Sequence, residues 1–291
     1  MPKITILMTV ICYFSMDLSI FTRATMMFHG DRSRIVDMIG TQLGGYSIEF
    51  LVIGILSYLI SKKLRDNLIN EYSQKKRIEN IQTKLIQSFA NIVEWNDQFT
   101  GEHIKRTSIY VELIARELVK QGNYAVELTE EKIQLMIKAA PLHDIGKISV
   151  PNNILNKPGK LTDEEFEIMK SHSETGYQIL EKELKDMEDP EYIQLAEDMA
   201  LYHHEKWNGQ GYPKKIAGEE IPLSARIMAA ADVLDALLSK RQYKDAFTID
   251  KTMEIFKESS GSHFEPCIVD AVLALKDRIF DISSGKYAAV A

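Results

Sequence analysis

Two nearly continuous apolar runs occupy the first sixty residues of the chain. Residues 4–21 contain one charge, Asp17, and residues 41–61 contain one charge, Glu49. The second run has about the ~20 residues that a membrane-spanning helix needs, and the first is shorter. Both runs are apolar around their whole circumference, and the residues that connect them are too few to cover two buried core helices. The pattern therefore predicts two transmembrane helices.

The charges that follow the second run predict its orientation. Lys62, Lys63 and Arg65 come directly after it, and basic residues gather on the cytoplasmic side of membrane helices. The first run lacks a small-residue cleavage site, which favours a helix over a signal peptide. We therefore expect a protein of the cell membrane whose C-terminal part, the soluble domain, lies in the cytoplasm.

A third apolar pattern follows the membrane region. Within the polar stretch 65–93, apolar residues recur at spacings of three and four, as on a helix that packs against one partner; they are Ile78, Ile81, Leu85, Phe89 and Ile92. The pattern in residues 65–93 has two interpretations. The stretch is either a signalling linker, through which two chains form a homodimer, or the first helix of the soluble domain. The expected organisation is a membrane region at 1–62, a helical linker at 63–80 and a soluble domain at 81–282.

Helical periodicity continues through most of the remaining chain. Residues 106–120 carry apolar side chains at helical spacing, and a second helix is expected to run from Thr129, its N-cap, to His143. Further helices begin near Ser224 and Pro266. No run alternates with period two for long enough to predict a sheet. The expected fold is therefore all-α.

Local signals also mark one loop and one helix start. Residues 149–161 contain two prolines and a glycine and are expected to form a loop. Thr162 followed by Glu165 is a capping box, which predicts a helix that reaches His172.

Composition narrows the classes of function. The chain has 291 residues, 45% of them hydrophobic and 26% charged, which is typical of a globular protein. Its net charge of −7 argues against binding to a nucleic-acid polymer, because phosphate backbones are held by clustered Lys and Arg. Cys12 and Cys267 have no spacing typical of a thiolate metal site or a disulfide framework.

The histidines suggest a metal site. Of the seven in the chain, five gather around two motifs: His103, His143, His172, His203 and His204. Adjacent residues on a helix point about 100° apart, so a His-Asp pair such as His143-Asp144 can reach one site from two directions, and its carboxylate can bridge two cations. Imidazole and carboxylate without thiolate suit iron, manganese or zinc. One such pair is weak support, but its combination with Asp232 and the other histidines makes a surface role improbable.

These residues carry a family resemblance that covers about residues 81–281. The chain resembles an HD-GYP domain, a branch of the HD phosphohydrolase superfamily. The matching segments, in chain order, are 97–106, 143–147, 157–162, 169–172, 203–213, 231–237, 241–244 and 263–266.

The resemblance implies an HD-type helical bundle with two or three divalent metal ions, usually iron or manganese. It implies hydrolysis of cyclic di-GMP, a bacterial second messenger, to a linear dinucleotide and, after a second cut, to GMP. By position, the residues that match metal ligands are His103, His143, Asp144, His172, His203, His204 and Asp232. Asp144 matches the bridging ligand, and Lys147 matches the residue that faces the scissile phosphate. Groups that match nucleotide contacts are Lys147, Tyr212, Arg241 and Lys244, while Asp235 is expected to be structural.

One departure from the family pattern concerns the number of ions. Members with three metals have a carboxylate where this chain has Phe99, so two ions are favoured and a third stays open. Two rival functions stay open as well: a phosphohydrolase acting on another cyclic dinucleotide or nucleotide, and a membrane-tethered module that binds a cyclic dinucleotide without turnover. The second rival usually lacks the His-Asp pair or the Gly-Tyr-Pro loop, and this chain has both.

Overall fold

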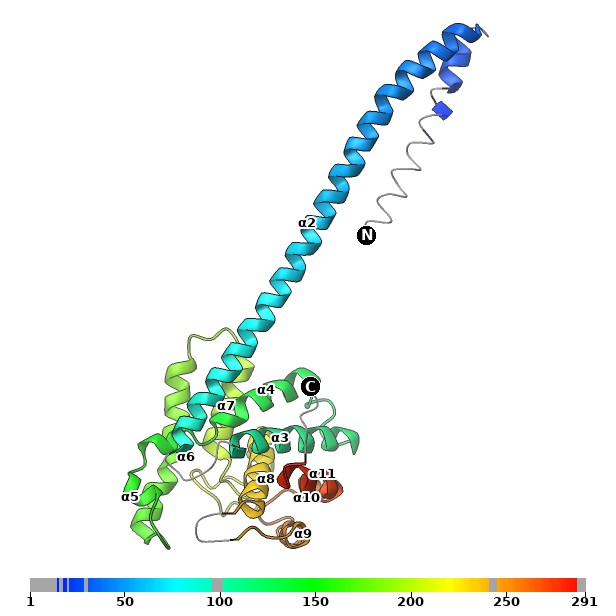
Figure 1. The fold of residues 1–291 in the computed structure, drawn as a ribbon. Coiled ribbons are helices and arrows are strands. Elements are labelled where there is room, and N and C mark those ends of the chain that lie inside the picture. The colour runs from blue at the N-terminus through cyan, green and yellow to red at the C-terminus, as the bar shows by residue number, and fades with distance from the viewer. Residues whose placement is uncertain are drawn as a thin grey trace. The chain divides into compact units, whose positions relative to one another are not determined.

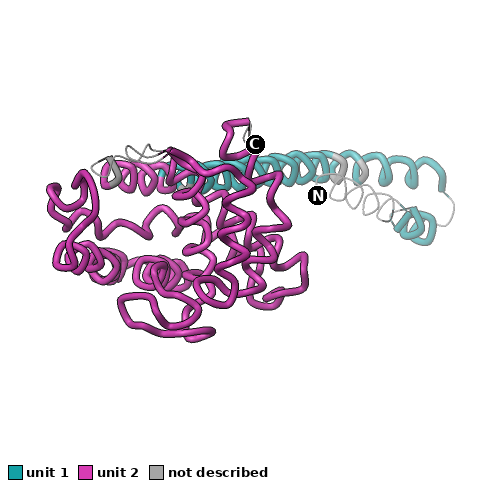
Figure 2. The backbone as a smooth tube through the Cα atoms, turned by 90° about the horizontal axis from the view of Figure 1, so that it is seen from below, with its two compact units in different colours: residues 1–81 teal, residues 82–291 magenta. Residues whose placement is uncertain are grey.

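The computed structural model describes residues 15, 18–19, 21–28, 31–95, 102–240 and 245–286. The chain divides into two compact units, residues 1–81 and 82–291 (Figure 2). Most of the first predicted transmembrane helix, 4–21, lies outside the described residues. Phe99, Arg241 and Lys244 lie outside them as well.

The most extended element is helix α2 (Arg32–Trp95), with 64 residues (Figure 1). It contains the second apolar run and the predicted linker without a break between them. Among the described residues, no helix combines the length and the apolarity that crossing a membrane requires. The structure therefore does not support the predicted pair of transmembrane helices.

The C-terminal end of α2 belongs to the second unit and packs on that unit's core through side chains next to the apolar stripe. Ala90 and Val93 are buried, and Ile86 packs against the core. Leu85 and Phe89 are instead exposed, as is Ile92. The packed face is thus one residue further along the helix, where the small side chain of Ala90 permits a close approach. This end of α2 is the first helix of the second unit.

The second unit is built from helices, as the sequence predicts (Figure 1). The principal ones are α3 (Glu102–Lys120), α4 (Glu130–Ala139), α6 (Asp163–Leu184), α7 (Pro190–Tyr202), α8 (Leu223–Leu238), α9 (Ile249–Glu258), α10 (Pro266–Ala274) and α11 (Lys276–Ser283). Short helical turns are η1 (Ala140–Leu142), η2 (Ile145–Ser149), α5 (Asn152–Leu155) and η3 (Gly218–Glu220). The described residues contain no β-strand beyond one isolated bridge.

The predicted helix starts are confirmed by their hydrogen bonds. Thr129 caps α4 by accepting from the N–H of Lys132. Thr162 and Glu165 form the capping box of α6, each side chain accepting from the backbone N–H of the other. The predicted loop 149–161 differs in containing the single turn of α5.

Helix α8 forms the centre of the second unit. Its first nine residues, Leu223–Ala231, are all buried, and it packs against α3, α7 and α9. A helix that is buried on every side shows no amphipathic stripe. The last two turns of α8 carry Asp232 and Asp235, so the core itself positions both carboxylates.

Candidate metal centre

The seven predicted metal ligands come from helices that are far apart in the sequence. His103 lies in the first turn of α3, and Asp232 lies on α8. His143 and Asp144 lie at the junction of η1 and η2, where the sequence predicts a helix end. The remaining ligands are His172 in α6, and His203 and His204 directly after α7.

The fold brings these residues into two groups. One contains Asp144, His172, His203 and His204, and the other contains His103, His143 and Asp232. Within each group, one nitrogen or oxygen atom from each residue lies within 4.8 Å of all the others. Each group is thus compact enough to hold one metal ion.

The carboxylate of Asp144 connects the two groups. Its Oδ1 atom lies 3.3 Å from Nε2 of His172 and 3.6 Å from Nε2 of His203. Its Oδ2 atom lies 3.2 Å from Nε2 of His143, and that imidazole is 4.0 Å from Oδ1 of Asp232. One oxygen therefore faces each group, which is the arrangement of a carboxylate that bridges two cations.

Backbone carbonyls fix the protonation of three imidazoles. Nδ1 of His143 donates to the carbonyl of Ala140 at 2.8 Å. In the same way, Nδ1 of His172 donates to the carbonyl of Met169 at 2.7 Å, and Nδ1 of His203 donates to that of Met199 at 2.8 Å. A carbonyl oxygen can only accept, so the proton sits on Nδ1. In the neutral form of such a ring, Nε2 keeps the lone pair that a metal ion requires.

His103 is held in the same way by a side chain. Its Nδ1 lies 2.7 Å from Oδ2 of Asp235, which is fully buried. Asp235 also accepts from Arg106, with Nε at 2.5 Å and Nη2 at 3.0 Å, and from the hydroxyl of Ser239 at 3.1 Å. Burial alone would raise the pKa of Asp235, but His103 and Arg106 outweigh it, and the pKa is lowered. Asp235, which was expected to be structural, thus positions the ring of His103. The sequence signal for this role was its spacing of three residues from the predicted ligand Asp232.

The electrostatics of the centre suit a bound cation. Burial lowers the pKa of His203 and His204, which keeps both rings neutral. Burial would raise the pKa of Asp144, but the ammonium of Lys147, 2.7 Å from Oδ2, and the neighbouring imidazoles hold it well below its usual range. Neutral imidazoles beside an ionised carboxylate are the forms that bind metal.

One buried oxygen tests whether a metal ion fits. Oδ1 of Asp144 accepts no hydrogen bond among the described residues. The two atoms that face it, Nε2 of His172 and of His203, are themselves acceptors because their protons are on Nδ1. A cation between these three atoms would satisfy all of them, so the residues fit a metal ion.

The loop after His204 brings Tyr212 to the edge of the centre. The N–H of Tyr212 donates to the carbonyl of His204 at 3.2 Å, and the two rings lie 4.6 Å apart. Gly211 permits this fold, because a Cβ there would lie 2.4 Å from Cα of Glu205. Burial, together with the charge of Asp144, raises the pKa of Tyr212, so its hydroxyl stays protonated. Among the predicted nucleotide contacts, Lys147 and Tyr212 thus lie at the centre.

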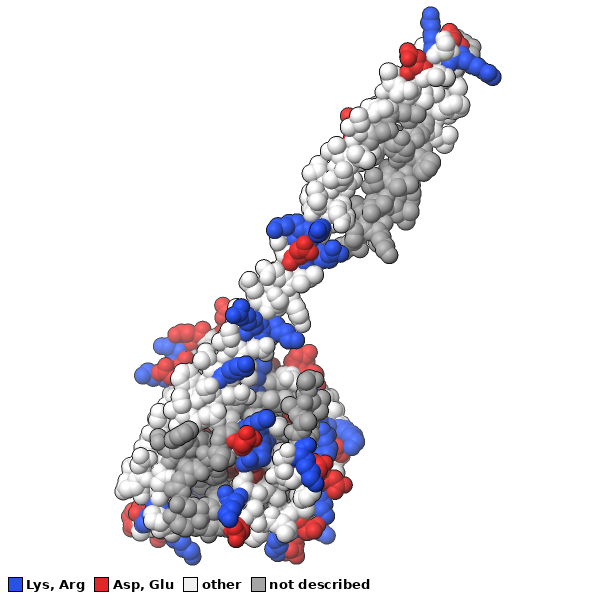
Figure 3. Space-filling model, in the orientation of Figure 1, with Lys and Arg blue, Asp and Glu red and all other residues white. Residues whose placement is uncertain are grey.

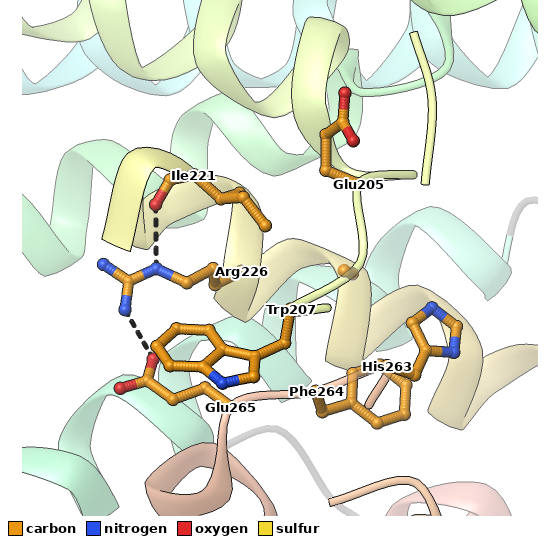
Figure 4. Close-up of a pocket in the computed structure, with 8 residues that line it drawn as sticks. Glu205, Trp207, Ile221, Arg226, His263, Phe264 and Glu265 are labelled. Atoms are coloured by element: carbon orange, nitrogen blue, oxygen red, sulfur yellow. Dashed lines mark hydrogen bonds and ion pairs between the residues drawn. The ribbon is translucent and has the colours of Figure 1, made fainter. Parts of the chain in front are cut away.

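A buried ion pair fixes the same loop from its other side (Figure 4). Arg226 donates to Glu265 at 2.5 Å, to the hydroxyl of Tyr124 at 2.9 Å and to the carbonyl of Ile221 at 2.8 Å. Its guanidinium lies 5.7 Å from the centre of the Trp207 ring. The half-buried Trp207 ring therefore packs against this ion pair, which links the loop to α8 and to the N-cap residue of α10.

Comparison with known proteins places this fold and site in a family. The family model of the HD domain matches residues 85–268. A cyclic di-GMP phosphodiesterase of Vibrio cholerae is 42% identical over 226 residues, which are 78% of this chain and 45% of that protein. The 3'3'-cGAMP-specific phosphodiesterase 2 of the same species is 39% identical over 199 residues, 68% of this chain and 36% of that protein. The chain spans about half the length of the curated relatives it matches.

The fold has a counterpart among solved structures. A crystal structure of cyclic GMP-AMP-specific phosphodiesterases in Vibrio cholerae aligns with a TM-score of 0.50 and 20% identity, over 71% of this chain and 51% of that one. The helical fold, the ordered His and Asp ligands and the match to the family model agree. The chain belongs to the HD domain family, in its HD-GYP branch.

Proposed function

We propose that the protein is a metal-dependent phosphodiesterase that hydrolyses cyclic di-GMP to a linear dinucleotide, and then to GMP, in bacterial second-messenger signalling. The observation that carries the proposal is the placement of Asp144 between two compact groups of ligands. Two cations a few Å apart are a recurrent device for cleaving phosphate esters. The names of the relatives, several of them cyclic di-GMP phosphodiesterases, support the choice of substrate.

The ligand set favours two divalent ions, iron or manganese. One ion would be held by His172, His203 and His204, and the other by His103, His143 and Asp232, with Asp144 shared between them. The donors are nitrogen and oxygen atoms without thiolate, a set that suits these metals. When bound, such ions supply an activated water at neutral pH and positive charge for the phosphate oxygens.

The chain's own residues prepare the reaction around that chemistry. The ammonium of Lys147 lies 2.7 Å from Asp144, so it stands beside the place where a phosphate would be held and can neutralise charge that grows on its oxygens. The protonated hydroxyl of Tyr212 can donate a hydrogen bond to the substrate. From the sequence alone, Arg241 and Lys244 are proposed as further nucleotide contacts.

Product analysis on the metal-loaded full chain tests the proposal. Metal content is measured by mass spectrometry, and products are separated by chromatography after incubation with cyclic di-GMP or 3'3'-cGAMP. Conversion of cyclic di-GMP to the linear dinucleotide is expected. A preference for 3'3'-cGAMP would instead indicate the substrate specificity that the names of three relatives state. If the metal-loaded protein binds cyclic di-GMP without turnover, the chain is a non-catalytic module that binds a cyclic dinucleotide.

We also propose that the chain resides at the cell membrane with its catalytic unit in the cytoplasm. The support is the apolar run 41–61 and the three cations after it. Large apolar side chains on this part of α2 are exposed, from Ile48 at 67% to Ile60 at 57%, and Figure 3 shows few charged atoms there. Separation of membranes from soluble protein tests this location; recovery of the full chain in the soluble fraction alone would contradict it.

A homodimer through α2 is a further proposal. Leu85, Phe89 and Ile92 are 51%, 60% and 63% exposed, while the neighbouring face of the helix, with Ala90 and Val93, packs on its own unit. A second copy presents the same apolar face, so the two stripes can cover one another. Light scattering measures the mass: a monomer at micromolar concentration would contradict the proposal, and a dimer should dissociate in a Phe89→Glu variant.

A further inference from the structure

Tyr212 does not end the row of aromatic rings that begins at the metal centre. The Tyr212 ring lies 4.6 Å from that of His204, and the Phe166 ring lies 6.2 Å beyond it in an edge-to-face contact of 82°. Phe166 is in the first turns of α6, and 46% of it is exposed. The row therefore leads from a half-buried candidate metal ligand, His204, to a ring that is open to solvent.

A positive charge lies where the last two rings meet. Nζ of Lys170, one turn further along α6, is 5.3 Å from the centre of the Phe166 ring and 5.9 Å from that of Tyr212. A cation at such distances is attracted by the ring faces. Glu167 holds the same ammonium at 2.5 Å. Lys170 is thus kept beside both rings while 24% of its side chain stays exposed.

The core does not require Phe166 at this position. A single exposed Phe is common on protein surfaces and by itself indicates nothing. Phe166 differs through its surroundings, because it contacts an aromatic ring that borders the metal centre and carries an ammonium over its face. Aromatic rings interleaved with positive charge are the surface that binds nucleotides.

We propose that Phe166 and Lys170 extend the substrate pocket along α6, with Phe166 stacking against one purine of the cyclic dinucleotide and Lys170 facing a phosphate. The inference rests on the proposed function and names a part of its site. A phosphate held between the two groups of ligands leaves the nucleobases outside them, each separated by a ribose. Phe166 offers a base a flat apolar surface at the rim, and the Lys170 ammonium acts there as a point charge.

A Phe166→Ala variant of the full, metal-loaded chain tests the stacking contact. Loss of one base–aromatic stack should raise KM for cyclic di-GMP about tenfold or more. Because stacking is present in the ground state and the transition state alike, kcat should stay within about twofold. Phe166→Trp, which restores a ring, should keep KM near the wild-type value. The kcat for bis(p-nitrophenyl) phosphate, a diester without base or ribose, should stay within about twofold in both variants.

Two further variants separate this contact from general effects. Phe280 on α11 is a matched control, because it is 44% exposed and also carries an ammonium, that of Lys286, 5.5 Å from its ring. Phe280→Ala should leave KM for cyclic di-GMP unchanged. Lys170→Gln should raise KM less than Phe166→Ala does, and the difference from wild type should shrink as salt is added, because exposed charges are screened.

The outcomes distinguish this inference from the proposed function. An unchanged KM in Phe166→Ala would overturn the stacking contact while leaving cyclic di-GMP hydrolysis intact. Equal losses on both substrates would also overturn it, since the ring would then only support the metal centre. If the wild type cleaves the simple diester but no cyclic dinucleotide, the proposed function fails. In that case, calorimetry on cyclic di-GMP tests the stacking contact by binding alone. A Kd about tenfold higher in Phe166→Ala than in the wild type supports the contact, and equal binding by both proteins, or no binding by the wild type, overturns it.

Discussion

Replacing Asp235 by asparagine should empty one half of the metal centre. The change keeps the shape of the side chain but removes its charge and turns one acceptor oxygen into a donor. Whichever way the amide lies, an N–H group will face either Nδ1 of His103 or the guanidinium of Arg106. Loss of such a supporting hydrogen bond typically costs ~10–100-fold in metal affinity. We expect the ion at His103, His143 and Asp232 to be lost first.

The Asp235→Asn variant should also be less stable, because the charge of Arg106 remains after its carboxylate partner is removed. Asp235 is fully buried and the side chain of Arg106 is 19% exposed, so the guanidinium charge would stay largely out of water without its carboxylate. Breaking a buried pair costs about 3–5 kcal/mol, and the partial exposure of Arg106 suggests the lower end of this range. Urea unfolding followed by circular dichroism measures the loss.

The stability that Asp235 contributes should depend on pH in a defined direction. The folded-state pKa of Asp235 is lowered from its ordinary value of 3.8, so its ionised form contributes stability above that value and loses the contribution as pH falls through the folded pKa. The stability gap between wild type and Asp235→Asn should be constant at neutral pH and narrow below about pH 4. Ser239→Ala is the control: it removes a hydroxyl from Asp235 and leaves His103 held. Full metal content in Asp235→Asn, or a gap at pH 3 as wide as the gap at pH 7, would refute this reasoning.

Three other changes address the bridge, the packing and the loop network. Asp144→Ala should abolish turnover and lower metal content while circular dichroism still reports a helical protein; a fully active variant would contradict the bridging role. Gly146→Ala should destabilise the fold by about 1–3 kcal/mol or more, because a Cβ there would lie 1.9 Å from the carbonyl of His172; an unaltered urea midpoint would show that the helices can separate. Glu265→Gln should lower the free energy of unfolding by about 3 kcal/mol by leaving Arg226 without its carboxylate, and equal stability of variant and wild type would be the contrary result.

The sequence predicted the all-α fold and the residues that gather at the centre, because both depend on local patterns. Caps such as Thr129 and Thr162 act within one turn, so a sequence shows them directly. The ligands were found because histidines are few and their motifs follow in a recognisable order. Neither inference required knowledge of how the helices pack.

What the sequence could not give depends on packing between distant elements. The stripe on α2 predicted one packed face, with a partner either in a second chain or in the domain. The face that packs in the domain lies one residue further along the helix and includes Ile86 and Ala90. Helix α8 is buried on all sides over its first turns, so periodicity could not show which of its faces meets the ligands. The role of Asp235 required seeing His103, from another helix, beside it.

The distribution of the ligands from position 103 to position 232 has a consequence for the lifetime of the protein. An unfolded chain cannot assemble donors from α3, α6, α7 and α8, so the ions bind the folded state in preference to the unfolded one. Free metal at about 100 times its dissociation constant would then add ~2.7 kcal/mol to the free energy of unfolding. A cell that is short of metal would therefore lose more than activity. The unoccupied protein would open more often and present itself to proteases, so its abundance would follow the metal supply.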